Sequence, residues 1–167
     1  MKMCIFDFVS HFDTKKRVLC GGFEMNKIII EGVALFLVAL ETGRILVVKE
    51  LQSKTGIKEK GMLSIPAETS HPEEEDRDTL GRLFHEEIGI DPILCEKIAL
   101  LHWINGRDFR ADVSLFVGSV DREFPPSPQD GEDVAFHAWM YPEELLSSWV
   151  RSGVAESTEH FLRWRDR

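Results

Sequence analysis

The sequence predicts a single α/β domain, residues 1–167, in which a β-sheet is covered by helices. Three observations support this fold class. The length of 167 residues suits one compact domain with a sizeable core. Runs rich in β-branched and large apolar residues between positions 28 and 49 predict strands that are covered on both faces. Apolar residues at four-residue spacing between positions 79 and 88 predict a helix.

Composition narrows the class of protein. With 43% hydrophobic and 29% charged residues, the chain is expected to fold as a globular domain. Its net charge of -9 argues against a nucleic-acid-binding protein and favours a small ligand or an anion neutralised by metal. No apolar run reaches the roughly 18 residues that span a bilayer, and Asp7 interrupts any signal-peptide core. We therefore expect a cytoplasmic protein with no membrane partner.

Two pairs of apolar runs predict two hairpins in the first part of the chain. The first pair belongs to an N-terminal extension, residues 1–25, and the second begins the core, residues 28–150. The runs are residues 3–9 with 17–23, and Ile28 to Leu40 with Arg44 to Lys49. The polar residues from Gln52 to Gly61 then predict an exposed loop.

The predicted helix covers Thr79 to Ile88, and Gly89 follows it as a C-terminal cap. The rest of the chain alternates strand-like and helical segments, with a C-terminal helical region over residues 154–167. The predicted strands are Ile93 to Trp103, Ala111 to Val120 and Ala135 to Met140, and the predicted helices are Pro142 to Val150 and Glu156 to Arg165.

Two consecutive acids near the end of the first helix are the candidates for chemistry. On a helical wheel with about 100° per residue, Glu87 borders the apolar stripe and Glu86 lies further from it. A carboxylate beside a buried face is costly unless an arginine, backbone donors or a divalent cation pairs with it. The alternative is that Glu86 pairs with Arg82 one turn earlier, while Glu87 reaches water.

The segment from Glu68 to Ile90 resembles the signature of the Nudix hydrolase family, in a degenerate form. That signature has the order Gly, five residues, Glu, seven residues, then Arg-Glu-apolar-any-Glu-Glu-any-Gly-apolar. Residues of this chain that fall at the required spacing are Glu74, Arg82, Phe84, Glu86, Glu87, Gly89 and Ile90. The similarity covers about residues 28 to 150 and leaves the last helix outside.

The resemblance implies a fold, an activity and roles for residues. The fold would be a Nudix-like mixed β-sheet sandwiched between helices. The activity would be Mg²⁺-dependent hydrolysis, with Mn²⁺ as the alternative ion, of a diphosphate linkage in a nucleoside diphosphate derivative. Glu86 and Glu87 would be metal-binding and catalytic residues, and the pair Glu74 and Arg82 would pin the loop to the helix. Metal ions suit this task because they neutralise the diphosphate and help to activate water.

Two positions depart from the signature. Glu68 replaces the first glycine, so the loop is built with a side chain that is less free to take positive φ. Leu83 replaces the first glutamate of the helix and removes one member of the carboxylate cluster. Magnesium accepts water in place of missing ligands, so binding should survive in weakened form. Glu68 could also turn its carboxylate into the site and compensate for Leu83.

Further candidates lie outside the signature. Glu132, beside Asp133, is at a place where family members often carry another metal-binding or base carboxylate, with a solvated acidic turn as the alternative. Trp103, Arg107 and Arg110 flank a loop and could stack on a base and hold phosphate, although Trp103 also suits the core. The six histidines and three cysteines lack metal-ligand spacing.

The leading function is thus a divergent Nudix-type hydrolase acting on phosphoric anhydrides, with a nucleotide-type small molecule as substrate. The alternative is a catalytically inactive Nudix-like module that binds a nucleotide or a protein. Leu83 and Glu68 favour the alternative, whereas Glu86 and Glu87 favour the enzyme. The substrate, the general base and the oligomeric state stay open, and a homodimer is compatible with the sequence.

Overall fold

The computed structural model describes residues 28–54, 57–105, 109–129, 131 and 133–167, and its centre is a mixed β-sheet of seven strands. Five strands follow the order β3-β2-β1-β6-β5, while β4 pairs with β1 and β7 pairs with β2. The strands are β1 (Ile28–Ala39), β2 (Ile45–Glu50), β3 (Leu63–Ser64), β4 (Ala67–Thr69), β5 (Cys95–Asn105), β6 (Phe109–Val120) and β7 (Val134–Met140).

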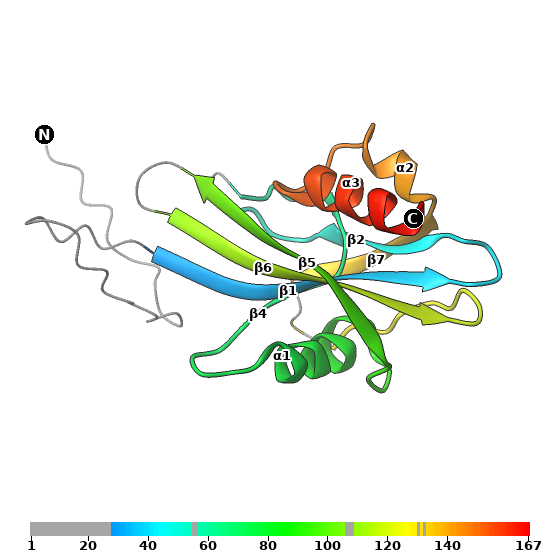
Figure 1. The fold of residues 1–167 in the computed structure, drawn as a ribbon, viewed down its shortest axis with the longest axis horizontal. Helices are drawn as coiled ribbons and strands as arrows, with labels where there is room; N and C mark the ends of the chain where they lie inside the picture. The colour runs from blue at the N-terminus through cyan, green and yellow to red at the C-terminus, as the bar shows by residue number, and fades with distance from the viewer. Residues whose placement is uncertain (1–27, 55–56, 106–108, 130, 132) are drawn as a thin grey trace, which may run out of the picture.

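Helices cover both faces of the sheet, as Figure 1 shows. One face carries α1 (Asp76–Leu83), which continues into a π-helical turn, η1 (Phe84–Ile88). The other face carries α2 (Pro142–Leu145) and α3 (Val154–Arg165). This is the mixed α/β fold that the sequence predicts. Within the described part of the chain, no helix has the length and apolar character that crossing a membrane requires.

Strand β1 divides the core into two layers. It runs parallel to β6 along its whole length and antiparallel to β2 and β4 on its other edge. Because side chains alternate along a strand, Val33 and Leu35 face the helix α1, whereas Ala34 and Phe36 face α3. The ring of Phe36 stacks on Phe161 of α3 at a centroid distance of 4.5 Å. The layer between β1 and α1 holds the segment that resembles the Nudix signature.

The predicted start of α1 and the predicted end of α2 were wrong. Helix α1 begins at Asp76 rather than Thr79. Acidic residues in its first turn stabilise this start, because they interact favourably with the positive end of the helix dipole. The predicted helix from Pro142 to Val150 stops at Leu145.

Local hydrogen bonds explain the early end of α2. The hydroxyls of Ser147 and Ser148 both donate to the carbonyl of Glu144, so they compete with the helical backbone. Beyond them, the carbonyl of Trp149 accepts a bond from the N–H of Leu63 in β3. The chain therefore leaves the helix to pair with a strand.

The remaining boundaries differ from prediction by a few residues. Strand β5 begins at Cys95 rather than Ile93, and α3 begins at Val154 rather than Glu156. The predicted N-terminal hairpin, residues 3–9 with 17–23, lies outside the described residues.

A buried acid joins β2 to two loops. The side chain of Glu50 is fully buried, with Oε2 2.7 Å from Lys58 Nζ and Oε1 3.2 Å from Arg151 Nη1. Lys58 also lies 3.3 Å from a carboxylate oxygen of Asp133. The segment Gln52 to Gly61, predicted to be an exposed loop, therefore contributes a lysine whose side chain is only 10% exposed. A buried carboxylate is tolerated only when such partners neutralise it.

Replacing Lys58 by methionine should destabilise the fold. Lys58→Met leaves the buried Glu50 with Arg151 as its remaining cationic partner, and we expect a loss of about 2 to 4 kcal/mol in the free energy of unfolding. Urea denaturation measures it. Lys60→Met, on the exposed side of the same loop, is the matched control. Equal urea midpoints for the two variants would contradict this account of Glu50.

Candidate active site

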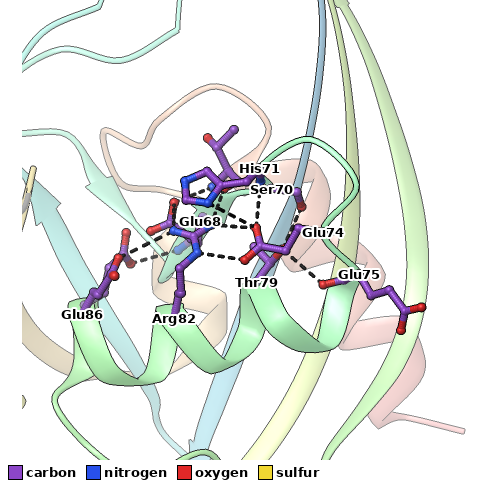
Figure 2. Close-up of polar contacts among 11 residues, drawn as sticks. Glu68, Ser70, His71, Glu74, Glu75, Thr79, Arg82 and Glu86 are labelled. Carbon is purple, nitrogen blue, oxygen red and sulfur yellow. Dashed lines mark hydrogen bonds and ion pairs between the residues drawn. The ribbon is translucent and has the colours of Figure 1, made fainter. Parts of the chain in front are cut away.

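Arg82 of α1 ties the preceding loop to the helix (Figure 2). Its Nε and Nη2 atoms donate to the two carboxylate oxygens of Glu74, each at 3.0 Å, and Nη2 also donates to the carbonyl of Thr69 at 2.7 Å. Its Nη1 atom lies 3.3 Å from Glu68 and 3.6 Å from Glu86. One guanidinium thus contacts three carboxylates, which come from β4, from the loop and from the following turn of helix.

This bidentate pair changes the titration of both groups. The hydrogen bond from Arg82 holds the pKa of Glu74 at about 2, although partial burial acts in the opposite direction. A backbone N–H, from His71, also donates to Glu74 at 2.7 Å and lowers its pKa further. The same bond to Glu74 raises the pKa of Arg82, so its charge is present at every accessible pH. The loop between β4 and α1 is therefore closed by an ion pair that persists until the pH falls to about 2.

Glu87 lies buried beside the loop. Its residue is 5% exposed, and its Oε2 atom accepts a hydrogen bond of 3.1 Å from the backbone N–H of Ala67. The alternative considered for Glu87, a side chain that reaches water, was wrong. Backbone donation to a carboxylate is one of the compensations that a buried acid requires.

Glu86 lies at the rim of the same region. Its side chain is 34% exposed, and Oε2 is 3.6 Å from Nη1 of Arg82. The alternative reading of Glu86, as a partner of Arg82 one turn earlier, therefore describes this contact. At 3.6 Å the pair is an ion pair without a direct hydrogen bond, so the carboxylate keeps acceptor capacity.

The last turn of the helix is wider than an α-helix. The carbonyl of Phe84 accepts bonds from the N–H groups of Gly89 and Ile90, at 2.8 and 3.1 Å. Gly89 has φ of 77°, and a Cβ atom there would lie 2.3 Å from the carbonyl oxygen of Ser127. Glycine is required at this cap because both the backbone angle and the close approach exclude a side chain.

The loop that follows β6 packs against this turn. Ser127 donates its N–H to the carbonyl of Ile88 at 3.0 Å, and Gln129 donates its N–H to that of Glu86 at 2.7 Å. These bonds bring the chain just before Asp130-Gly131-Glu132-Asp133 to the helix end. Glu132, the predicted further carboxylate, lies outside the described residues, so its role stays a prediction.

Leu83 points into the core. It is 0% exposed and belongs to the apolar cluster between α1 and the sheet. Its neighbours in that cluster include Val33, Leu35, Leu80, Phe84 and Ile88. The residue at the signature position of the missing glutamate is thus part of the apolar layer rather than of the carboxylate rim.

Of the predicted substrate-binding residues, the structure describes Trp103 and Arg110. Trp103 packs against the α3 layer, and its Nε1–H donates to Glu156 at 2.6 Å, on the face of the sheet opposite α1. Arg110 donates from Nε to Asp112 at 2.7 Å, and Asp112 also lies 2.7 Å from Nδ1 of His102. Arg107 lies outside the described residues. Trp103 and Arg110 therefore already have protein partners, and their contact with a substrate stays a prediction.

A sequence model of the NUDIX domain matches residues 30–164. The chain belongs to the Nudix family. The match extends beyond residue 150, where the resemblance seen in the sequence ended, and includes α3 almost entirely. No curated protein sequence matches the chain.

Solved structures of Nudix proteins have the same fold. The MutT protein of Methanosarcina mazei Go1 superposes with a TM-score of 0.68 at 18% identity, over 86% of this chain and 100% of its own. A Nudix hydrolase from Nitrosomonas europaea gives 0.64 at 18% identity, over 82% and 90%. The Nudix domain of Shewanella oneidensis NrtR, complexed with ADP ribose, gives 0.64 at 15% identity, over 84% and 89%. At these identities the likeness shows the fold alone.

Nudix proteins generally use divalent metals, and the donor set here fits such an ion only in part. Among the described residues, no group of three or more His, Cys, Asp or Glu side chains is arranged to hold a metal. Glu86 and Glu87, which are adjacent in the sequence, supply two carboxylates. Magnesium is commonly held by one or two carboxylates together with water and substrate phosphates, so these two residues suit it without a complete protein cage.

Backbone groups are the part of the site that the sequence analysis missed. The N–H of Ala67 reaches Glu87, and the carbonyl of Thr69 accepts from Arg82. Every residue except proline carries both groups, so no residue type in the sequence marks them. Only the pairing of β4 with β1, through Gly32 to Ala34, places them opposite the helix.

Removing Arg82 should loosen the loop. Arg82→Ala leaves Glu74 without its bidentate partner, and we expect the free energy of unfolding to fall by about 1 to 3 kcal/mol at pH 7. Because the folded-state pKa of Glu74 is about 2, below its ordinary 4.5, the pair stabilises the fold fully above pH 4.5. This stabilisation is lost as the pH falls towards 2, so the difference between variant and wild type should shrink there.

The measurement is a urea midpoint for both proteins at pH 7 and at several values down to pH 2.5. Arg77→Ala, an exposed arginine on the same helix, is the control. A midpoint for Arg82→Ala that equals the control at pH 7 would show that the pair is not structural.

Magnesium alone should bind weakly. With two neighbouring carboxylates and no third ligand group among the described residues, we expect a Kd in the millimolar range, roughly -4 kcal/mol. Calorimetric titration with MgCl₂ measures it. A micromolar Kd would show that a further side chain completes the site.

Proposed function

We propose that the protein is a metal-dependent hydrolase that cleaves a diphosphate linkage in a nucleoside diphosphate derivative. The observation that carries this proposal is the buried carboxylate of Glu87, which the Ala67 N–H holds where β4 meets the signature helix. A buried acid at this place is costly to a fold, and a cationic ligand is a reason to keep it. Glu86, the preceding residue, has a side chain that is 34% exposed, so a substrate could reach it.

Each residue of the site has a separate task in this proposal. Glu86 and Glu87 would hold Mg²⁺ or Mn²⁺, which when bound neutralises phosphate charge and makes coordinated water more acidic. Arg82 and Glu74 keep the loop closed, so the Ala67 N–H stays on Glu87. The base that accepts the proton of the attacking water remains to be assigned, with Glu132 as the first candidate because it follows the loop that packs on η1.

Relatives in fold support a nucleotide-type substrate. The NrtR domain of Shewanella oneidensis was solved with ADP ribose, and another relative, from E. coli, is a dihydroneopterin triphosphate pyrophosphohydrolase. Both ligands contain phosphoanhydride linkages. We infer that this chain acts on the same chemical class.

A second candidate function is a Nudix module that binds a nucleotide without cleaving it. Two observations favour it: Leu83 is buried in the core, and Glu86 faces Arg82. Both reduce the carboxylate charge available to a metal. Hydrolysis assays separate the two functions, because binding alone produces no product.

The test is hydrolysis of ADP-ribose, diadenosine polyphosphates and nucleoside triphosphates, with and without MgCl₂ or MnCl₂. Each salt is used at about 5 mM, which is close to the Kd expected above. Glu86→Gln and Glu87→Gln keep the shape of each side chain and remove its charge. We expect each to lower kcat by about 100-fold or more, because a weaker metal site loses several kcal/mol of charge stabilisation.

Glu41→Gln, in the exposed turn between β1 and β2, is the matched control and should retain wild-type activity. Absence of hydrolysis by the wild type with any substrate and either metal would overturn the proposed activity. Tight binding of a nucleotide without turnover would then support the binding module.

A further inference from the structure

The glutamate at the signature glycine position contacts the arginine of the loop. Glu68 Oε1 lies 3.3 Å from Nη1 of Arg82, and the same Nη1 lies 3.6 Å from Glu86 (Figure 2). We propose that Glu68 is a positioning residue whose charge beside Nη1 of Arg82 weakens the attraction of the guanidinium for Glu86 and so leaves the Glu86 carboxylate available to a divalent cation. This inference rests on the proposed function, which places the cation at Glu86 and Glu87.

The hydrogen-bond donors of Arg82 are almost fully assigned. A guanidinium has five N–H donors in a fixed fork. Nε and Nη2 bind Glu74, and the second hydrogen of Nη2 reaches the carbonyl of Thr69. Only Nη1 remains, with its two hydrogens, and it faces the carboxylates of both Glu68 and Glu86. The negative charge of Glu68 beside Nη1 therefore affects how strongly Arg82 attracts Glu86.

Glu68 is held in place for this contact. Its Oε1 accepts a 2.8 Å hydrogen bond from the N–H of Thr69, and its side chain is 18% exposed. Its backbone pairs with Val33 of β1, and a Cβ on Gly32 would lie 2.6 Å from its carbonyl oxygen, so β1 and β4 are closely apposed. The backbone of Glu68 is held by the sheet and its carboxylate by the Thr69 N–H. The side chain therefore loses little conformational entropy when it contacts Arg82.

A glycine at position 68 would change the charge balance. Arg82 would then face Glu74 and Glu86 alone, and Nη1 would have Glu86 as its remaining carboxylate partner. Closing the 3.6 Å separation to a direct hydrogen bond would make a charge-assisted pair, which a cation must break before it can use that oxygen. Glu68 prevents this competition. The departure from the signature at position 68 thus supports the site, although it removes the family's glycine.

The first measurement is Mn²⁺ binding by electron paramagnetic resonance, in which the signal of free aqueous Mn²⁺ reports the unbound fraction. Glu68→Gln and Glu68→Gly are compared with Glu75→Gln, a matched loss of charge at an exposed residue just before α1 with no contact to Arg82. We expect both Glu68 variants to bind Mn²⁺ about three- to tenfold more weakly and the control to stay within about twofold. Urea midpoints establish that each variant is folded.

The second measurement is a crystal structure of Glu68→Gln without metal. We expect Nη1 of Arg82 to move from 3.6 Å to hydrogen-bond distance of Glu86, about 2.8 Å. A shift of this kind is specific to positioning through Arg82. It needs no metal and no activity, so it separates this role from a general effect on stability.

Unchanged Mn²⁺ affinity in folded Glu68→Gln would overturn the inference. Weaker Mn²⁺ binding with Arg82 unmoved would also overturn it, because Glu68 would then act on the ion directly. A third outcome is that Mn²⁺ binding depends on Glu68 but the wild type hydrolyses no substrate. This outcome would support the inference and refute the proposed activity. Absence of Mn²⁺ binding by the wild type would also refute the inference, because the inference assumes a cation at Glu86 and Glu87.

Discussion

The guanidinium of Arg82 is the contact on which the rest of the site depends. Through Glu74 and the Thr69 carbonyl it fastens both ends of the segment between β4 and α1 to one helix position. Because that segment is fixed, β4 presents the Ala67 N–H to Glu87, and a carboxylate can stay buried beside the apolar layer. The main effect of the Arg82–Glu74 ion pair on the site is therefore to hold the Ala67 N–H, which is the backbone donor to Glu87, in position.

The two departures from the Nudix signature have opposite physical effects. Leu83 adds an apolar side chain to the layer under α1, which favours the fold and removes a charge from the site. Glu68 adds a negative charge in β4, where its carboxylate lies 3.3 Å from Arg82. A carboxylate at this position partly replaces the one that the helix lacks at Leu83. Acidic side chains thus lie around Arg82, at Glu68 and Glu86, whereas position 83 belongs to the apolar core. In the proposed function, a metal ion would have few protein ligands at this site and would rely on water and substrate for the others.

Shared architecture does not decide the substrate. Structures with 14 to 18% identity to this chain share its fold, yet one is a complex with ADP ribose and another is a dihydroneopterin triphosphate pyrophosphohydrolase. A fold fixes where the signature helix lies, whereas the groups that contact a nucleoside come from loops and from the open ends of strands. In this chain, two candidates of that kind, Trp103 and Arg110, are engaged with Glu156 and Asp112. A substrate would have to use or displace those contacts.

The sequence by itself determined the fold class, the strands around Ile28 to Lys49 and the helix that carries Glu86 and Glu87, because burial within one element leaves a periodic pattern along the chain. It also indicated the family through spacing alone. Only the tertiary structure decided which partners those side chains have. Glu50 meets Arg151 from 101 positions away, and Glu87 meets a backbone N–H from 20 positions away. The wide turn η1 likewise shifts the helical wheel just where the two acids lie. Both contacts join segments that are distant in the sequence, and the second uses a backbone group that no residue type marks, so local periodicity carries no record of them.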